Sequence, residues 1–330
     1  MFLKMSGGLM AVFLLVFLAV NFESVNSMKL IDSRMMLGSV PTNTTKNYTT
    51  YMASIRLKSA EETQGFGYGY ICDGVIISEN LILTTTSCLL TSTDANATVR
   101  DVSEFLVVVG NIYRYNNDSS TLEFDVINLS THDDFNSTSL ENDIAILKLN
   151  ASIPSNWATA QTIPLGTAEV PESTQCVVTS WQSQIGPTVQ LKTQISLEYV
   201  NIKNNTGCFS SGTPVASLGN DLPGSMICAA AVDGEGLLSN CGGDSGAPLV
   251  CDDALIGIVS WGNGCNFVGP FPGVYTNVTY FNSWIQYTSL ELNGGGIEVT
   301  TEHGDGATSV LNQSKYGVLI VMLLALFMRN

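Results

Sequence analysis

Two segments of the sequence hold polar side chains in settings suited to nucleophilic chemistry. Residues 240–248 read Asn-Cys-Gly-Gly-Asp-Ser-Gly-Ala-Pro and present Ser245 in a glycine-rich loop, while Asp143 lies shortly before an apolar run. A serine hydroxyl attacks well only when a base within hydrogen-bond reach accepts its proton and an acidic side chain orients that base. The chain has 2 histidines, His132 and His303, which excludes a histidine-rich metal site. No phosphate-binding loop of the GxGxxG type is present either, so no cofactor is expected.

The segments that must position these side chains are short and extended. Between about residues 35 and 290, β-branched or aromatic runs are separated by clusters of Gly, Pro, Asn and Asp, which indicates an all-β barrel or sandwich. A helix is expected only near the end of this region, at about Tyr280–Leu290. The expected strands include Tyr51–Leu57, Gly74–Ile77, Leu81–Thr85, Phe105–Gly110, Ile144–Leu149, Cys176–Trp181, Ala247–Cys251, Leu255–Trp261 and Gly273–Val278.

The chemically promising segments closely resemble those of trypsin-like serine proteases. Residues 240–248, followed by Ser260-Trp-Gly262, are similar to that family's nucleophile loop and substrate-binding strand, and residues 141–149 resemble the strand that bears its triad aspartate. The resemblance covers residues 35–290, nearly the whole mature chain. It implies an all-β fold of two antiparallel six-stranded β-barrels of the chymotrypsin type, with a short C-terminal helix.

The resemblance also assigns roles. Ser245 takes the nucleophile position and Asp143 that of the orienting carboxylate. The backbone N–H groups of Gly243 and Ser245 would form the oxyanion hole, which Gly243 allows because a side chain there would crowd the loop.

The position of the base is where this sequence departs from the family. The segment that normally reads Thr-Ala-Ala-His-Cys reads Thr-Thr-Thr-Ser-Cys here, with Ser87 in place of the histidine. Because a hydroxyl cannot take up a proton at neutral pH, Ser245 would stay a neutral alcohol. We expect Ser87 to hydrogen-bond Asp143, since a buried carboxylate without a partner is costly. Neither His132, where relatives often carry a surface-loop histidine, nor His303, in the tail, is expected to take over as the base.

By the same resemblance, Ser239 lies at the base of the primary specificity pocket and Gly262 and Gly273 form its walls. An acidic residue at the base would select Lys or Arg, whereas serine and two glycines leave an open, neutral slot suited to a large apolar or aromatic side chain. Alternatively, the glycines only satisfy backbone geometry. The strand Ser260–Gly262 could also pair with an extended peptide by β-addition. Asp73, where the family commonly has glycine, is expected to place a charge near the mouth of the site.

Activation by cleavage is left open by the sequence. Family members are usually cleaved before an Ile-Val-Gly-Gly-like start, and the new amino group pairs with the aspartate preceding the nucleophile. The counterpart here is Arg34 followed by Met35-Met-Leu-Gly, with Asp244 as the partner. Arg34 permits the cut, but Met35 and Leu37 fit the usual buried groove less well.

Cysteines and glycosylation motifs indicate the secretory pathway. The 8 cysteines are an even number, which suits an oxidising compartment. The family's pairing implies the bridges Cys72–Cys88, Cys176–Cys251, Cys208–Cys228 and Cys241–Cys265, with no cysteine left over. Sequons of the Asn-x-Ser/Thr type, candidate glycosylation sites, lie at Asn43, Asn47, Asn96, Asn117, Asn128, Asn136, Asn150, Asn204, Asn277 and Asn312.

Both ends of the chain carry apolar segments with the layout of targeting signals. Residues 1–27 are typical of a secretory signal peptide, because their apolar run Leu9–Val20 is shorter than the roughly 20 residues of a membrane span. Gly304, Asp305 and Gly306 are candidate attachment residues for a GPI lipid anchor, with a transmembrane helix or a merely sticky C-terminus as alternatives. The remaining boundaries are a propeptide-like segment at 28–34, the protease-like domain at 35–290, a polar linker at 291–315 and a removable hydrophobic signal at 316–330.

The composition narrows the class of partner. The formal net charge of −16 argues against nucleic acid and against anionic membrane surfaces, because both are polyanions. The leading prediction is a serine protease homologue that does not cleave peptide bonds, is displayed outside the cell, and binds a protease, an inhibitor or another extracellular protein. The alternatives are an active endopeptidase with an apolar pocket and an unconventional base, such as water held by Asp143, or a structural surface glycoprotein.

Overall fold

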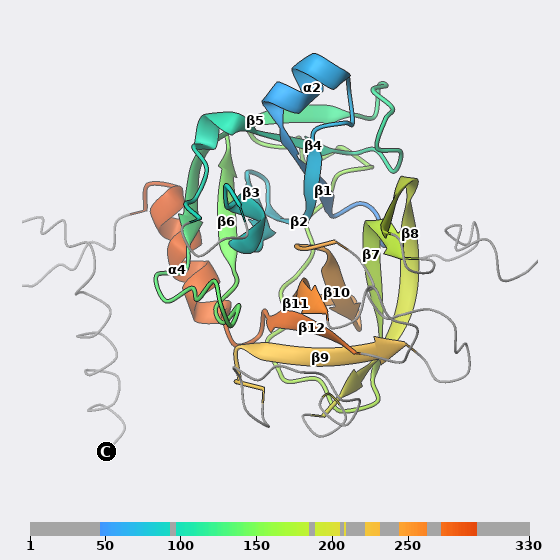
Figure 1. Ribbon diagram of the computed structural model, residues 1–330, viewed down its shortest axis with the longest axis vertical. Coiled ribbons are helices and arrows are strands. Elements are labelled where there is room, and N and C mark those ends of the chain that lie inside the picture. The colour runs from blue at the N-terminus through green and yellow to red at the C-terminus, as the bar shows by residue number, and fades with distance from the viewer. Residues whose placement is uncertain are drawn as a thin grey trace, which may run out of the picture.

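The computed structural model describes residues 47–92, 97–184, 189–204, 208, 222–231, 244–262 and 272–295. Their strands form two closed antiparallel barrels of six strands each (Figure 1). In order around the first barrel, the strands are β1 (Met52–Leu57), β2 (Tyr70–Ser78), β3 (Leu81–Thr84), β6 (Ala145–Leu149), β5 (Leu122–Thr131) and β4 (Phe105–Val109). Around the second, they are β10 (Pro248–Cys251), β11 (Ala254–Gly262), β12 (Gly273–Asn277), β9 (Met226–Ala231), β8 (Val189–Lys203) and β7 (Gln175–Gln184). The predicted chymotrypsin-type fold is confirmed, and the sandwich alternative is wrong.

The strands form where apolar and polar residues alternate along the sequence, or where a tight turn can connect two strands. In β5, the buried Phe124 and Val126 alternate with the exposed Glu123 and Asp125, so one face points into the barrel and the other into solvent. Between β10 and β11, Asp252 and Asp253 have φ of 48° and 65°. Two consecutive left-handed residues give the turn whose twist matches that of a hairpin.

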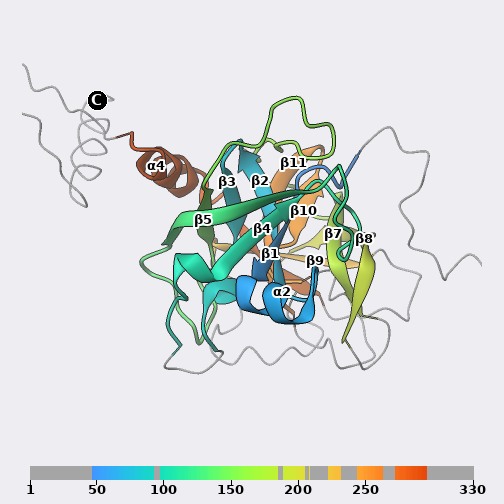
Figure 2. The same cartoon turned by 90° about the horizontal axis from the view of Figure 1, so that it is seen from above.

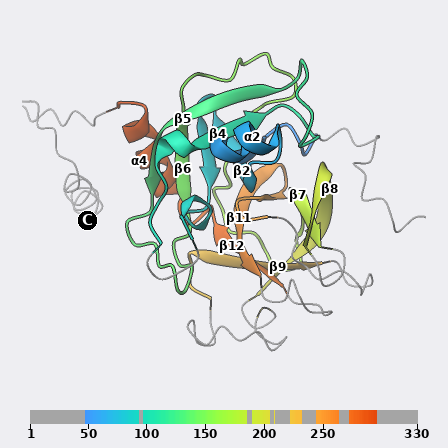
Figure 3. The same ribbon diagram turned by 45° about the horizontal axis from the view of Figure 1, so that its top comes forward.

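The two barrels share an apolar core. Leu83 and Ile146 from the first barrel belong to the same buried cluster as Val250 and Ile258 from the second, together with Trp181, which is 2% exposed. The C-terminal helix α4 (Asn282–Leu292) lies beside β5 and β6 of the first barrel (Figure 3). This shared cluster joins the two barrels along their junction.

The expectation of a single helix was wrong, because the first barrel carries a second one. Helix α2 (Lys58–Gln64) lies against β1 on the outside of the barrel (Figure 2). Its sequence Lys-Ser-Ala-Glu-Glu-Thr-Gln contains good helix formers, and it ends at Gly65, whose φ of 106° a side chain would oppose. None of its residues is buried, so it has no apolar periodicity that would have predicted it.

Three of the four expected disulfides are present, namely Cys72–Cys88, Cys176–Cys251 and Cys208–Cys228. The fourth pair, Cys241 and Cys265, lies outside the described residues, as do both chain ends with their predicted signals, Arg34, Met35 and the candidate attachment residues Gly304, Asp305 and Gly306. Within the described ranges, no helix is long and apolar enough to cross a membrane.

Candidate active site

Asp143 lies at the junction of the two barrels, just before β6. Its carbonyl oxygen accepts a hydrogen bond of 2.7 Å from the hydroxyl of Thr276 on β12 of the other barrel. The side chain is 0% exposed. A carboxylate removed so completely from water requires hydrogen-bond donors on both oxygens.

The donors to Asp143 come from two segments. Ser87 donates its main-chain N–H to Oδ1 at 2.8 Å and its hydroxyl to Oδ2 at 2.8 Å. Ser260, on β11, donates its hydroxyl to Oδ2 at 2.6 Å. Burial raises the pKa of the Asp143 carboxyl, and the bonds from Ser260 and Ser87 counteract part of that rise. The predicted bond between Ser87 and Asp143 is confirmed, whereas Ser260 is a partner that no spacing in the sequence indicated.

Ser87 is held in place from both sides. It opens a short 3₁₀ turn, Ser87–Leu89, whose Cys88 is bonded to Cys72 on β2. The preceding Thr86 donates its hydroxyl to the carbonyl of Ile144 at 2.8 Å. The serine therefore occupies a rigid position beside the carboxylate, with its hydroxyl directed at Asp143.

Ser245 lies in a loop that packs onto β2. Its carbonyl oxygen accepts the N–H of Asp73 at 3.0 Å, and its own N–H donates to Oδ1 of Asp244 at 3.1 Å. The next residue, Gly246, has a φ of 85°, and a Cβ there would lie 2.0 Å from the carbonyl oxygen of Asp73. Only glycine fits at this position. Among the described residues, no base forms a hydrogen bond with the Ser245 hydroxyl.

The expected charge at the mouth of the site was wrong. Asp73 is 0% exposed and lies beneath the loop that carries Ser245. Its carboxyl oxygens accept hydrogen bonds from the hydroxyls of Tyr70, at 3.0 Å, and Ser180, at 2.6 Å. The sequence marked Asp73 as unusual, but its inward orientation depends on Ser180, which reaches its carboxyl from β7 of the other barrel.

The predicted pocket is described in part. Gly262 and Gly273 face each other as a pair in the β11–β12 register, so the two wall residues are neighbours. Ser239, at the expected base, and Gly243, of the expected oxyanion hole, lie outside the described residues. The roles of all four remain predictions.

The histidine within the described domain is engaged elsewhere. The ring of His132 packs against Phe281 and Trp284, with centroids 5.3 Å and 5.5 Å away. Its Nδ1 accepts the N–H of Asp134 at 3.2 Å, and burial lowers its pKa. His132 is therefore held toward α4, and His303 lies outside the described residues.

The predicted glycosylation sites fall mainly on the surface. Asn277 is partly buried in β12 and donates its amide to the carbonyl of Gly224 at 3.0 Å. Asn43, Asn96 and Asn312 lie outside the described residues. The exposed sequon residues are Asn47, Asn117, Asn128, Asn136, Asn150 and Asn204.

Comparisons with known proteins agree with this architecture. The family model described as Trypsin matches residues 40–285. Trypsin delta of Drosophila erecta is 30% identical over 214 residues, which cover 65% of this chain and 77% of that protein. Hypodermin-B of Hypoderma lineatum is 34% identical over 219 residues, 66% of this chain and 77% of that protein. Trypsin of Sarcophaga bullata is 31% identical over 230 residues, 69% of this chain and 83% of that protein. The chain therefore belongs to the trypsin family.

Proposed function

We propose that this chain is a non-catalytic member of the trypsin family that binds another extracellular protein, such as a protease, an inhibitor or a glycoprotein. The observation that carries the proposal is Ser87, whose hydroxyl donates to Asp143 from the position where the family places its base. A serine hydroxyl does not accept a proton at neutral pH, so Ser245 is left without activation. In a serine protease of another fold, loss of the histidine lowers turnover by about 10⁶-fold.

The remaining features of the site favour a retained binding function over a site that has lost all function. Asp143 keeps donors on both oxygens, and Gly262 and Gly273 are paired between β11 and β12, where the resemblance places the walls of a specificity pocket. The strand Ser260–Gly262 offers main-chain groups for β-addition. The family and the three disulfides are typical of secretory or extracellular proteins. We include attachment to the cell surface through a GPI lipid in the proposal.

An active-site probe tests the loss of chemistry. A fluorophosphonate, which reacts with an activated serine, should fail to label the natural chain, and Ser87→His should gain labelling. The double variant Ser87→His/Ser245→Ala is the matched control and should not label. Efficient cleavage of a peptide by the natural chain, abolished by Ser245→Ala, would overturn the proposal.

A second candidate is an endopeptidase with an apolar pocket that uses water held by Asp143 as its base. Two of the three relatives described above are named trypsins, which favours retained peptidase activity. The same peptide assay separates the two candidates, because only the second expects turnover in the natural chain.

The site of binding is tested by filling the pocket. Affinity capture from extracellular fluid should recover a partner with the natural chain and lose it with Gly262→Phe. Retention of the same partner by Gly262→Phe would instead support the third possibility, a surface glycoprotein in which the pocket plays no part.

A further inference from the structure

The outer face of β5 has an apolar gap between two helices. Helix α2 reaches this face at Asp125, whose carboxylate pairs with Lys58 at 2.8 Å. The C-terminal end of α4 reaches the neighbouring strand β6, where the amine of Lys148 donates to the carbonyl of Leu292. Between these two contacts, Ile127 remains 53% exposed. Neither helix therefore covers it.

The exposure of Ile127 follows from an irregularity in the strand pairing. In the register of β5 with β6, Val126 lies opposite Leu149 and Asn128 lies opposite Lys148, so Ile127 is the extra residue of a β-bulge. A bulge leaves its extra residue unpaired and changes the direction of the side chain. Ile127 and Asn128 are both exposed for this reason, although neighbours in a regular strand point to opposite faces.

Two Asn-x-Ser sequons border Ile127 on this face. Asn128 follows it directly along β5, and Asn150 follows β6 opposite Asp125, whose carbonyl accepts the Asn150 N–H at 2.9 Å. Because a strand rises about 3.4 Å per residue, the advance along β5 from Asp125 to Asn128 is at most roughly 10 Å. Both asparagines are exposed, so their side chains face the solvent on either side of Ile127.

The side-chain nitrogen of asparagine is the atom to which a glycan would be attached, and both residues present it to solvent. Asn128 uses its Oδ1, which accepts the N–H of Leu129 at 2.9 Å. With the residues that the structure describes, neither the Asn128 nitrogen nor the Asn150 side chain forms a hydrogen bond. The folded chain can therefore carry a sugar at either nitrogen without losing a contact.

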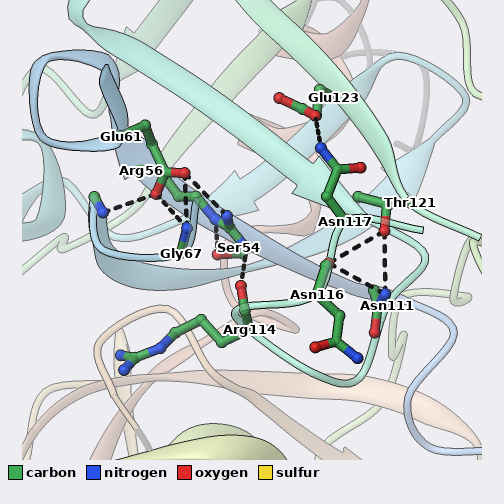
Figure 4. A network of polar contacts seen from close by, with 11 residues as sticks. Ser54, Arg56, Glu61, Gly67, Asn111, Arg114, Asn116, Asn117, Thr121 and Glu123 are labelled. Carbon is green, nitrogen blue, oxygen red and sulfur yellow. Dashed lines mark hydrogen bonds and ion pairs between the residues drawn. The ribbon is translucent and has the colours of Figure 1, made fainter. Parts of the chain in front are cut away.

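The sequon at Asn117 differs in this respect. Figure 4 shows its amide directed at Glu123 of β5, and the amide donates to that carboxylate at 2.8 Å. The loop that carries it is closed by Asn111, which donates to the carbonyl of Asn116 at 3.3 Å. A sugar at the Asn117 nitrogen would have to fit beside an existing hydrogen bond in a fixed loop, whereas Asn128 and Asn150 impose no such condition.

We propose that Asn128 and Asn150 carry N-linked glycans that together cover Ile127 and close the outer face of β5 and β6 to other proteins. Such glycans are bulky and solubilising, and the apolar side chain lies between their two attachment points.

A lipid-linked oligosaccharide diphosphate is the donor. The amide nitrogen forms a bond to C1 of the first sugar and gives up one proton, while the bond from C1 to the diphosphate oxygen breaks and the lipid diphosphate leaves with its electron pair. This modification requires passage through the secretory pathway but no binding partner. Its failure would therefore be distinct from failure of the proposed function.

Site occupancy is measured on the full chain secreted from cultured animal cells. Digestion by a peptide-N-glycosidase in water labelled with heavy oxygen converts each occupied asparagine into a labelled aspartate, which mass spectrometry locates. Asn128 and Asn150 should both be labelled in most molecules. If either one is unlabelled in most molecules, the proposal is overturned.

Coverage of Ile127 is tested by Asn128→Gln/Asn150→Gln, which removes both glycans. The matched control is Asn47→Gln/Asn136→Gln, which removes two exposed sequons outside the strands. Uncovering Ile127 should raise the self-association constant by about tenfold, because two molecules can then bury an aliphatic side chain between them. Light scattering over a range of concentrations measures this constant. An equal rise in the control would contradict the proposal.

Adding Ile127→Thr to the double variant separates coverage of one side chain from a general effect of lost sugars. Threonine keeps the β-branch that suits a strand and removes most of the apolar surface. The triple variant should return to the association constant of the natural chain. A constant that stays raised would show that Ile127 is not what the glycans cover.

Removal of the glycans from the folded, secreted chain covers the case in which the double variant is not secreted. After treatment with a peptide-N-glycosidase, the natural chain should bind a hydrophobic fluorescent dye more strongly than before. The Ile127→Thr chain, treated in the same way, should show no such gain. Equal gains in the two chains would overturn the proposal.

Discussion

Replacing Ser87 by alanine isolates the one hydroxyl that distinguishes this site. Ser87→Ala removes the 2.8 Å bond from Oγ to Oδ2 of Asp143 and keeps the main-chain bond to Oδ1. The carboxylate is 0% exposed, so water cannot replace the lost donor without rearrangement of the site. The variant should therefore fold with a destabilised Asp143.

The size of the effect follows from the remaining donors. A hydrogen bond to a charged group contributes about 1.5–3 kcal/mol to stability. Asp143 retains the hydroxyl of Ser260 and the N–H groups of Ser87 and Thr86, so we expect a loss near the lower end, about 2 kcal/mol. For a domain of this size, that lowers the melting temperature by roughly 4–8 °C.

The loss should also depend on pH. The folded-state pKa of Asp143 is raised, so its contribution to stability is greatest below the unfolded pKa and is lost as pH rises through the folded pKa. Removing a donor to the charged form raises the folded pKa further. The destabilisation by Ser87→Ala should thus be larger near pH 8 than near pH 4.

Urea unfolding followed by tryptophan fluorescence measures this loss, because Trp181 is buried between the barrels. The control is Ser155→Ala, at an exposed serine, which should change the free energy of unfolding by less than about 0.5 kcal/mol. If Ser87→Ala behaves like Ser155→Ala near pH 8, the hydroxyl does not stabilise Asp143 and the reasoning fails.

Three further changes follow from the same geometry. Asp73→Asn should leave the free energy of unfolding unchanged or raise it, and the gain should increase with pH, because a neutral amide replaces an acid whose pKa is raised by burial. Equal destabilisation at two pH values in urea unfolding would contradict this. Gly246→Ala should lower the free energy of unfolding by roughly 2–6 kcal/mol, because φ is positive and the new Cβ would lie 2.0 Å from a carbonyl oxygen. Gly294→Ala, at a similar φ but with no atom within 4 Å of the new Cβ, should lower it by only about 1–2 kcal/mol. Equal losses in urea unfolding would refute the clash at Gly246. Removing the Cys72–Cys88 bridge by a double alanine substitution should cost about 3 kcal/mol, given its separation of 16 residues, and an unchanged melting temperature would contradict this.

Much of the fold could be predicted from the sequence alone. The alternation of β-branched and turn residues indicated an all-β protein, and the motif around Ser245 indicated which barrels it forms. The resemblance to trypsin-like proteases likewise implied the Cys72–Cys88 bridge that the structure contains. These features depend on local sequence or on similarity to a known family, so they can be predicted without knowing which segments pack against each other. Helix α2 was missed because none of its residues is buried, so it leaves no hydrophobic pattern in the sequence.

The sequence also determined which residue occupies the place of the base, because Ser87 precedes Cys88 in a recognisable motif. Only the tertiary structure decided what surrounds it. Ser260 reaches Asp143 from the other barrel, and Asp73 turns inward toward Tyr70 instead of facing the mouth of the site. Contacts between segments far apart in the chain depend on how the barrels pack, and no local pattern encodes them.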